Sequence, residues 1–273
     1  MRTWWREISG LVLPAACAGC GRPRTELCGR CGAVPASGVP CRVRPSPAPP
    51  GLPEVFAAAP YDGAVRAVLL AHKERGGLSL VRPLGAALAA AVEAASGPVA
   101  GRAVPVRPLA LVPVPSARRA TARRGHDPTR RIALAAAARL RRGGTGALVC
   151  SALRQRRAVA DQAGLDARRR RANLAGALYV PAGARRLLAG CRVVVVDDVL
   201  TTGATLAEAA RALGAGTVCA QGAGTVCARG PGRGRAEPGK APVGGVRAAV
   251  VAASPSAFEI NPETNGKDHR CRW

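Results

Sequence analysis

The chain has 273 residues, of which 48% are hydrophobic, and it carries a formal net charge of +25 at pH 7. This length accommodates one substantial hydrophobic core together with a small accessory module. Aromatic residues make up only 3% of the chain, so Ala, Val and Leu must build the core, and base stacking on exposed aromatic rings is disfavoured. No apolar run reaches the length of about 18 residues that a membrane span requires.

The positive charge would attract polyanions such as nucleic acid, anionic lipid or a multiply phosphorylated metabolite. Almost all of it is arginine, because lysine occurs only at positions 73, 240 and 267. The alternative is that the arginines are solvated helix faces that reflect a compositional bias toward Arg, Ala, Gly and Pro. Charge alone does not choose between these interpretations.

The N-terminal segment has some features of a secretion signal, since Arg2 and Arg6 precede the apolar stretch Ile8–Cys17. The stretch is short and Pro14 interrupts it. We therefore expect a short amphipathic helix here and a cytoplasmic location for the protein.

Half of the ten cysteines lie between residues 17 and 41. Cys17-x2-Cys20 and Cys28-x2-Cys31 form two knuckles separated by seven residues, a spacing that suits four thiolates around one structural zinc ion. Cys41 is an alternative ligand without a CxxC partner. Two disulfides or four free thiols are the other alternative. The sequence favours a Zn²⁺ site within an N-terminal module at residues 1–44.

The chain after this module changes in composition twice. Residues 45–54 are rich in proline and are expected to form a stiff linker. From Val55 onward, short β-like runs alternate with longer Ala/Leu/Arg stretches, which predicts an α/β domain with a mainly parallel sheet over residues 55–260. The clearest strand candidates are Leu109–Pro113, Arg192–Val196 and Val246–Ala252.

Two helices are expected around these strands. One begins after Asp127, which can cap it, and its apolar face carries Ile132, Ala133, Ala136 and Leu140. The other begins near Gly203 and buries Leu206, Ala210 and Leu213.

The sequence AGTVCAQG at 215–222 is almost repeated as AGTVCARG at 223–230. Two copies are too few for a solenoid, so we expect one edge strand and an inserted loop. Residues 222–243 are expected to be mobile, and residues 261–273 to form a disordered tail.

The strongest functional signal is CRVVVVDDVLTTGATL at residues 191–206. Four valines predict a buried parallel strand with Asp197 and Asp198 at its carboxyl end, where open α/β sheets bind ligands. The backbone N–H groups of the following Thr/Gly turn would converge at a helix N-terminus and hold a phosphate. Gly203 would let that phosphate approach the backbone closely.

The two acids would repel a phosphate alone, but carboxylates accept hydrogen bonds from the vicinal hydroxyls of a ribose. The motif therefore predicts a site for a ribose 5-phosphate compound rather than a Walker A or GxGxxG site. The alternative is a surface turn with two exposed acids. The residues expected to bind the ligand are Asp197, Asp198, Thr201, Thr202, Gly203, Ala204 and Thr205.

This strand, acid pair and loop resemble the signature of the type I phosphoribosyltransferases. Further segments are similar to the ComF family in the same order: CAGCGRPRTELCGRC at 17–31, PYDGAVRAVLLAHKERG at 60–76, LVPVPSARRATARRGHDPTRRIA at 111–133 and DQAGLDARRRRANLAGA at 161–177. The resemblance implies a Rossmann-like parallel sheet of the type I phosphoribosyltransferase kind with a small N-terminal zinc module. The chain departs from the family's frequent GFNQ at Gly125–Pro128, which leaves His126 and Asp127 without an assigned role.

The resemblance also implies a ligand and a reaction. The ligand would be 5-phosphoribosyl 1-pyrophosphate (PRPP) with Mg²⁺, and the reaction would transfer the phosphoribosyl group to a nitrogen acceptor that the sequence does not identify. Pro115–Arg119 would form the pyrophosphate loop, with Arg118 and Arg119 binding PRPP, and Arg123–Arg131 would form a mobile basic cover. No catalytic residue is assigned.

Three functions follow from the resemblance and the charge. The first is a PRPP-using transferase linked to competence and DNA uptake. The second is a non-catalytic phosphoribosyl sensor, and the third is an accessory protein that binds single-stranded DNA and DNA-uptake proteins.

Overall fold

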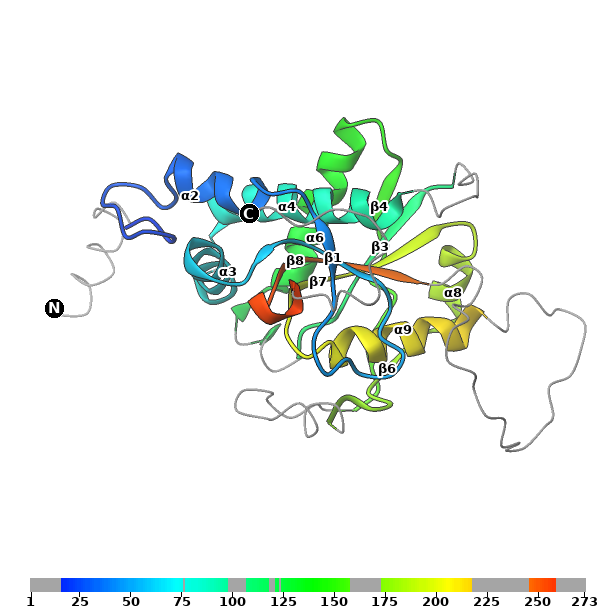
Figure 1. Ribbon diagram of the computed structural model, residues 1–273. Coiled ribbons are helices and arrows are strands. Elements are labelled where there is room, and N and C mark those ends of the chain that lie inside the picture. The colour runs from blue at the N-terminus through cyan, green and yellow to red at the C-terminus, as the bar shows by residue number, and fades with distance from the viewer. Residues whose placement is uncertain are drawn as a thin grey trace, which may run out of the picture.

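A computed structural model of the protein describes residues 16–75, 77–97, 107–117, 121–122, 124–157, 173–217 and 246–258. Its centre is a six-stranded sheet in the order β1-β2-β8-β7-β3-β4 (Figure 1). Only β1 is antiparallel to its neighbour, and the other pairs are parallel. The strands are β1 (Cys41–Val43), β2 (Val55–Pro60), β3 (Leu109–Pro113), β4 (Ala147–Val149), β7 (Arg192–Leu200) and β8 (Arg247–Ala253).

Helices cover both faces of this sheet, which is why its strands are apolar on both sides. On one face, α3 (Gly63–Arg75), α4 (Leu78–Ser96) and α6 (Pro128–Arg142) pack against Val194 and Val196. On the other face, α8 (Ala182–Leu188) and α9 (Ala204–Thr217) contribute to a second cluster around Val195. The ribbon of β5 (Arg154–Gln155) and β6 (Leu178–Tyr179) joins this second cluster. The predicted α/β class is thus confirmed.

The three central strand predictions agree with the structure to within a few residues. The largest difference is in β7, which continues to Leu200, so that Asp197 and Asp198 lie inside the strand and not after it. The helix-capping prediction is also confirmed, since the Asp127 carboxylate accepts a hydrogen bond of 3.1 Å from the amide of Arg130. The predicted apolar face of this helix is buried.

Other sequence expectations differ from the structure. The first copy of the repeated octapeptide does not begin with an edge strand, because α9 continues through Ala215–Thr217. Arg130 and Arg131 belong to the first turn of α6 and not to a covering loop. The rest of the repeat, the predicted mobile stretch 222–243, the tail 261–273 and the N-terminal amphipathic helix lie outside the described residues.

The cysteine-rich segment packs directly on the α/β domain. It contains α2 (Gly29–Ala33) and the 3-10 turn η1 (Val34–Ala36), and Ala18 and Leu27 pack against the core that α3 and α4 share. The proline-rich residues that follow are also held in place, because the Arg44 amide donates to the Ala257 carbonyl at 2.8 Å. None of the helices in the described part of the chain has both the length and the apolar character that crossing a membrane requires.

Candidate phosphate-binding site and metal centre

The four knuckle cysteines converge as their spacing predicts. The Sγ atoms of Cys17, Cys20, Cys28 and Cys31 all lie within 4.8 Å of one another. The Cys20 and Cys28 sulfurs are 3.8 Å apart, and two sulfurs bound tetrahedrally at the usual Zn–S length of about 2.3 Å would also be about 3.8 Å apart. Backbone amides support the cluster, since the amide of Cys28 donates to the Cys17 sulfur at 3.3 Å. The cluster could hold a structural metal ion such as zinc.

Without a cation, the clustered sulfurs perturb one another's pKa values. Burial raises the pKa of the Cys31 thiol, and the three other sulfurs raise it further, to about 12. Burial also acts to raise the pKa of Cys17, but the amides of Cys28, Cys20 and Gly19 outweigh it and lower that pKa to about 6. A cation between the sulfurs would replace their mutual repulsion with attraction. Cys41 lies apart from the cluster, in β1.

The predicted phosphate site lies where β7 ends and α9 begins, near the centre of the parallel sheet. Thr201, Thr202 and Gly203 form the turn between them, and α9 begins at Ala204. Thr201 is exposed, and Thr202 and Thr205 are half-buried, so part of this turn faces solvent. The predicted anion site therefore coincides with a partly exposed turn directly before the N-terminus of α9.

The two acids are held differently because neighbouring residues in a strand point to opposite faces of the sheet. The Asp198 side chain is buried and forms an ion pair of 2.8 Å with Lys73, which lies near the end of α3. The Asp197 carboxylate accepts a hydrogen bond of 2.9 Å from the Asp198 amide. Sequence reasoning treated these acids as equivalent, and only the structure distinguishes them.

The acid pair titrates unusually. Burial raises the pKa of Asp197 and the neighbouring Asp198 carboxylate raises it further, to about 8, while Lys73 acts in the opposite direction. Burial acts to lower the pKa of Lys73, but the carboxylates of Asp198 and Asp197 outweigh it and raise that pKa. Lys73 therefore stays charged beside Asp198, while Asp197 holds its proton more tightly than a free carboxyl group does.

Lys73 is a site residue that the sequence interpretation did not assign. It is one of only three lysines in the chain and lies in the segment PYDGAVRAVLLAHKERG, which carried part of the family resemblance. Its predecessor, His72, is fully buried, and the Nε2 atom of its ring lies 3.3 Å from the Pro128 carbonyl. Burial lowers the pKa of His72. The rarity of lysine in this chain was the signal that could have pointed to Lys73. A solvent-exposed lysine without a role in the site would have given the same signal.

Gly203, the glycine of the loop, is constrained both by its backbone conformation and by contacts with the proline-rich segment. Gly203 has φ of +74°, a conformation that favours glycine. A Cβ atom at this position would lie 2.9 Å from Leu52 and 3.4 Å from Pro45, both in the proline-rich segment. The need for glycine is thus explained by the turn and by Leu52, in addition to any close approach of a phosphate.

The predicted pyrophosphate loop begins beside the acid pair. The Val114 amide donates to the Val196 carbonyl at 3.0 Å, and the Ser116 hydroxyl donates to the Asp127 carboxylate at 3.3 Å. This places the start of the loop beside the middle of β7, next to Asp197. Arg118, Arg119 and Arg123 lie outside the described residues.

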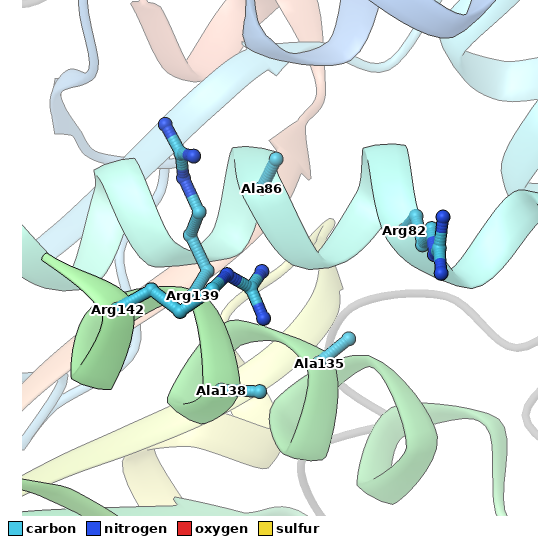
Figure 2. A pocket seen from close by; sticks show the side chains of 6 residues that line it. All are labelled: Arg82, Ala86, Ala135, Ala138, Arg139 and Arg142. Atoms are coloured by element: carbon cyan, nitrogen blue, oxygen red, sulfur yellow. The ribbon is translucent and has the colours of Figure 1, made fainter.

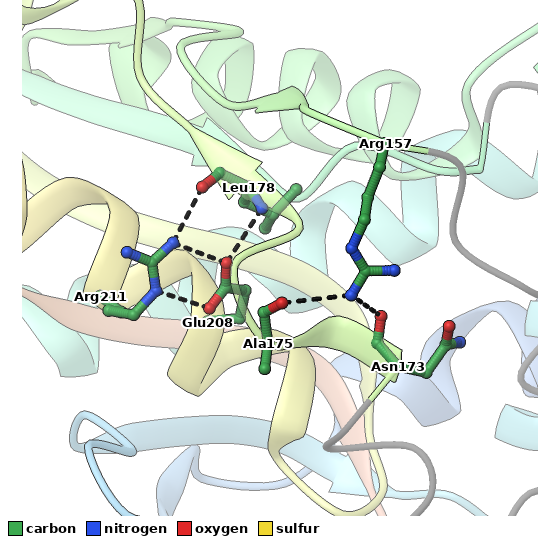
Figure 3. Close-up of polar contacts among 6 residues, drawn as sticks. All are labelled: Arg157, Asn173, Ala175, Leu178, Glu208 and Arg211. Atoms are coloured by element: carbon green, nitrogen blue, oxygen red, sulfur yellow. Dashed lines mark hydrogen bonds and ion pairs between the residues drawn. The ribbon is translucent and has the colours of Figure 1, made fainter.

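An ion pair between the buried Glu208 and the exposed Arg211 fixes α9 relative to the β5–β6 ribbon (Figure 3). Glu208 accepts a hydrogen bond of 2.9 Å from the Leu178 amide and pairs with Arg211 at 2.7 Å. Arg211 also donates to the Leu178 carbonyl at 3.0 Å. Burial acts to raise the pKa of Glu208, but Arg211 and the Leu178 amide outweigh it and lower that pKa. The contacts hold the helix whose N-terminus forms the loop.

The same figure shows a second contact at the ribbon. Arg157 donates to the carbonyls of Asn173 and Ala175 at 2.8 and 3.1 Å. These hydrogen bonds join the segment that ends at Arg157 to the segment that begins at Asn173. Figure 3 shows them together with the Glu208–Arg211 ion pair.

Comparison with known families agrees with this geometry. Residues 156–247 match the family model described as a phosphoribosyl transferase domain. The matched region includes β6, β7, the acid pair, the Thr/Gly turn and α9. The match supports a type I phosphoribosyltransferase-like family and a phosphoribosyltransferase type of function. A search of curated proteins found no match.

Proposed function

We propose that the protein binds PRPP or another phosphoribosyl compound at the junction of β7 and α9, as a ComF-like member of the phosphoribosyltransferase group. The observation that supports this most is the juxtaposition of an acid pair with a Thr/Gly turn that leads from a central parallel strand into the N-terminus of a helix. The turn offers N–H donors to the 5-phosphate, and the carboxylates offer acceptors to the ribose hydroxyls. The ligand residues are Asp197, Asp198, Thr201, Thr202, Gly203, Ala204 and Thr205, with Arg118 and Arg119.

The Lys73–Asp198 ion pair has a consequence for this binding. Asp198 already has a cationic partner at 2.8 Å, so a ribose hydroxyl must either share that carboxylate with Lys73 or displace Lys73 from it. An ammonium released from Asp198 would be free to meet a negative group of the ligand, because its stem is flexible. Lys73 therefore joins the proposed ligand-binding residues.

The proposed reaction is displacement at C1 of the ribose. The lone pair of a nitrogen nucleophile forms the new C–N bond, the C1–O bond breaks, and pyrophosphate leaves with that bonding pair. Charge builds up on the leaving group, where Arg118 and Arg119 would stabilise it. Mg²⁺, when bound with PRPP, would supply further positive charge to the pyrophosphate oxygens.

Ligand binding is tested by thermal unfolding of the full chain with PRPP and Mg²⁺, because a ligand selective for the folded state raises the melting temperature. Asp197→Asn with Asp198→Asn should abolish the rise. Glu93→Gln removes one exposed carboxylate on α4 and should leave it intact. The proposal is wrong if the wild type responds neither to PRPP nor to ribose 5-phosphate nor to any nucleoside 5′-monophosphate.

Transferase and sensor differ in one measurable product. Release of pyrophosphate from PRPP across a panel of amines and bases would establish a transferase. Binding without release in the presence of the whole panel would favour a phosphoribosyl sensor.

The remaining parts of the proposal concern metal, partner and location. We propose that Cys17, Cys20, Cys28 and Cys31 hold one structural Zn²⁺, and that the protein acts in the cytoplasm in competence and DNA uptake. The net charge of +25 favours a polyanionic partner, and we propose single-stranded DNA together with DNA-uptake proteins. Binding should then weaken steeply with salt and show little base preference, which titration at several salt concentrations measures. Tight, sequence-selective binding at high salt would contradict this.

A further inference from the structure

A groove of about 540 Å³ runs between α4 and α6, away from the proposed phosphoribosyl site (Figure 2). Three half-buried alanines and three exposed arginines line it: Arg82, Ala86, Ala135, Ala138, Arg139 and Arg142. The two helices cover the sheet face opposite α9, whose N-terminus forms the predicted phosphate turn. The groove is therefore distinct from that turn.

Close packing of the two helices explains the shape of the groove. A Cβ atom at Gly85 would lie only 2.5 Å from the Cβ atom of Ala135. Small residues at this crossing let the helices approach, and the alanines beside it leave a shallow floor without bulky side chains. The floor offers neither aromatic rings nor amide groups, so it has nothing with which to read a nucleotide base.

The side chains of the three arginines have no partner among the described residues. Neither a hydrogen bond nor an ion pair joins Arg82, Arg139 or Arg142 to another described side chain or carbonyl. Nearby arginines behave differently: Arg141 donates to the Ala147 carbonyl at 2.8 Å, and Arg247 pairs with Glu54 at 3.3 Å. The groove thus concentrates positive charge that the described part of the protein does not neutralise.

Helix electrostatics account for only part of this arrangement. Arg139 and Arg142 lie in the last turn of α6, where the helix dipole favours cations. Arg82 lies in the second turn of α4, where the dipole gives a cation no such stabilisation. Three like charges around one hollow also repel each other, and an anion between them would remove that repulsion.

We propose that the α4–α6 groove is a second anion site, which binds a short chain of linked phosphate groups. Guanidinium groups bind phosphate oxygens bidentately, and three of them around one hollow can hold successive phosphates of one chain. The volume lies within the range of small-molecule sites, which is roughly 300–1,000 Å³. The site recognises charge rather than a base or sugar, and it does not depend on the proposed phosphoribosyl site.

The test uses the full chain and inorganic triphosphate, with binding measured by isothermal titration calorimetry. Arg82→Gln with Arg142→Gln should weaken binding by about tenfold or more, since charge-assisted hydrogen bonds are lost from both helices. Arg107→Gln with Arg186→Gln is the matched control, because it removes the same charge from two exposed positions outside the groove. It should change the affinity less than about threefold. Arg82→Lys with Arg142→Lys keeps the charge but loses the bidentate contacts, so its affinity should lie between those of the wild type and the Gln variant.

Several outcomes would overturn the proposal. Equal losses in the groove pair and the control pair would show attraction by net charge alone, and no loss in the groove pair would place the anion elsewhere. Loss of triphosphate binding in Thr201→Ala with Thr202→Ala, which removes two hydroxyl donors from the β7–α9 turn, would place the anion at the phosphoribosyl site. If the binding of a single-stranded oligonucleotide depends on Arg82 and Arg142 while the binding of triphosphate does not, the groove binds nucleic acid instead. Melting temperatures of all variants confirm that they fold.

Discussion

The cysteine cluster and the junction of β7 and α9 are assembled in opposite ways. The four sulfurs come from a segment of 15 residues, Cys17 to Cys31, and their convergence needs only two tight knuckles. The β7–α9 site brings together Lys73, Asp198 and Gly203 with Leu52, which are far apart in the sequence. A local site is encoded by spacing, whereas a site between elements depends on how the whole domain packs. Substitutions should therefore have local consequences at the first and distributed consequences at the second.

The largest effect is expected at the cysteine cluster. Cys28→Ser should abolish metal binding and unfold residues 17–41, because structural zinc contributes on the order of 10–16 kcal/mol of binding free energy to small zinc modules. Metal analysis of the purified protein and limited proteolysis measure this. Cys150→Ser, outside the cluster, is the control and should keep about one zinc per chain. An oxidised, metal-free wild type with paired knuckle cysteines would contradict the prediction.

Lys73→Met tests the long-range contact and should lower the free energy of unfolding by about 2–4 kcal/mol, because it leaves the buried Asp198 carboxylate without its cation. Chemical denaturation measures the loss. The double variant Lys73→Met with Asp198→Leu should recover part of it, since both charges are then gone. Equal stability of Lys73→Met and wild type would mean that the ion pair is absent in solution.

Gly203→Ala should lower the free energy of unfolding by about 1–2 kcal/mol, since the residue has φ of +74° and its Cβ atom would meet Leu52. Leu52→Ala in the same chain should recover the steric part but not the backbone part. A full additive loss in the double variant would show that Leu52 does not lie against the loop.

The acid pair should also give the stability a pH dependence. Burial and Asp198 raise the pKa of Asp197 from its ordinary value of 3.8 to about 8, so the folded protein holds this proton more tightly than the unfolded chain. The contribution of Asp197 to stability is full below about pH 4 and is lost as the pH rises through about 8. The stability of the wild type relative to Asp197→Asn should therefore fall over this range in denaturant titrations. A difference that stays constant with pH would show that the pKa is not raised.

These two regions also show how far the sequence could be interpreted. The central strands, the Asp127 cap and the apolar face of α6 were predictable because hydrophobic period and capping chemistry act over a few residues. The stretch after Leu213 was wrongly predicted as an edge strand, because Ala215-Gly216-Thr217 carries little local signal and the preceding helix continues through it. The length of β7 was underestimated, because acidic residues are rare in strands. Here β8 pairs with the strand and Lys73 neutralises Asp198, and neither partner is evident from the local sequence.

The sequence by itself determined the four-cysteine cluster, the α/β class and the place of the acid pair beside a glycine-containing turn. Each of these follows from residue types at fixed short spacings. Only the tertiary structure decided that Asp198 meets Lys73, that Leu52 lies over Gly203, and that Arg82 joins two arginines of α6. Those contacts join residues far apart in the chain, and they form only because sheet order and helix packing bring these side chains together.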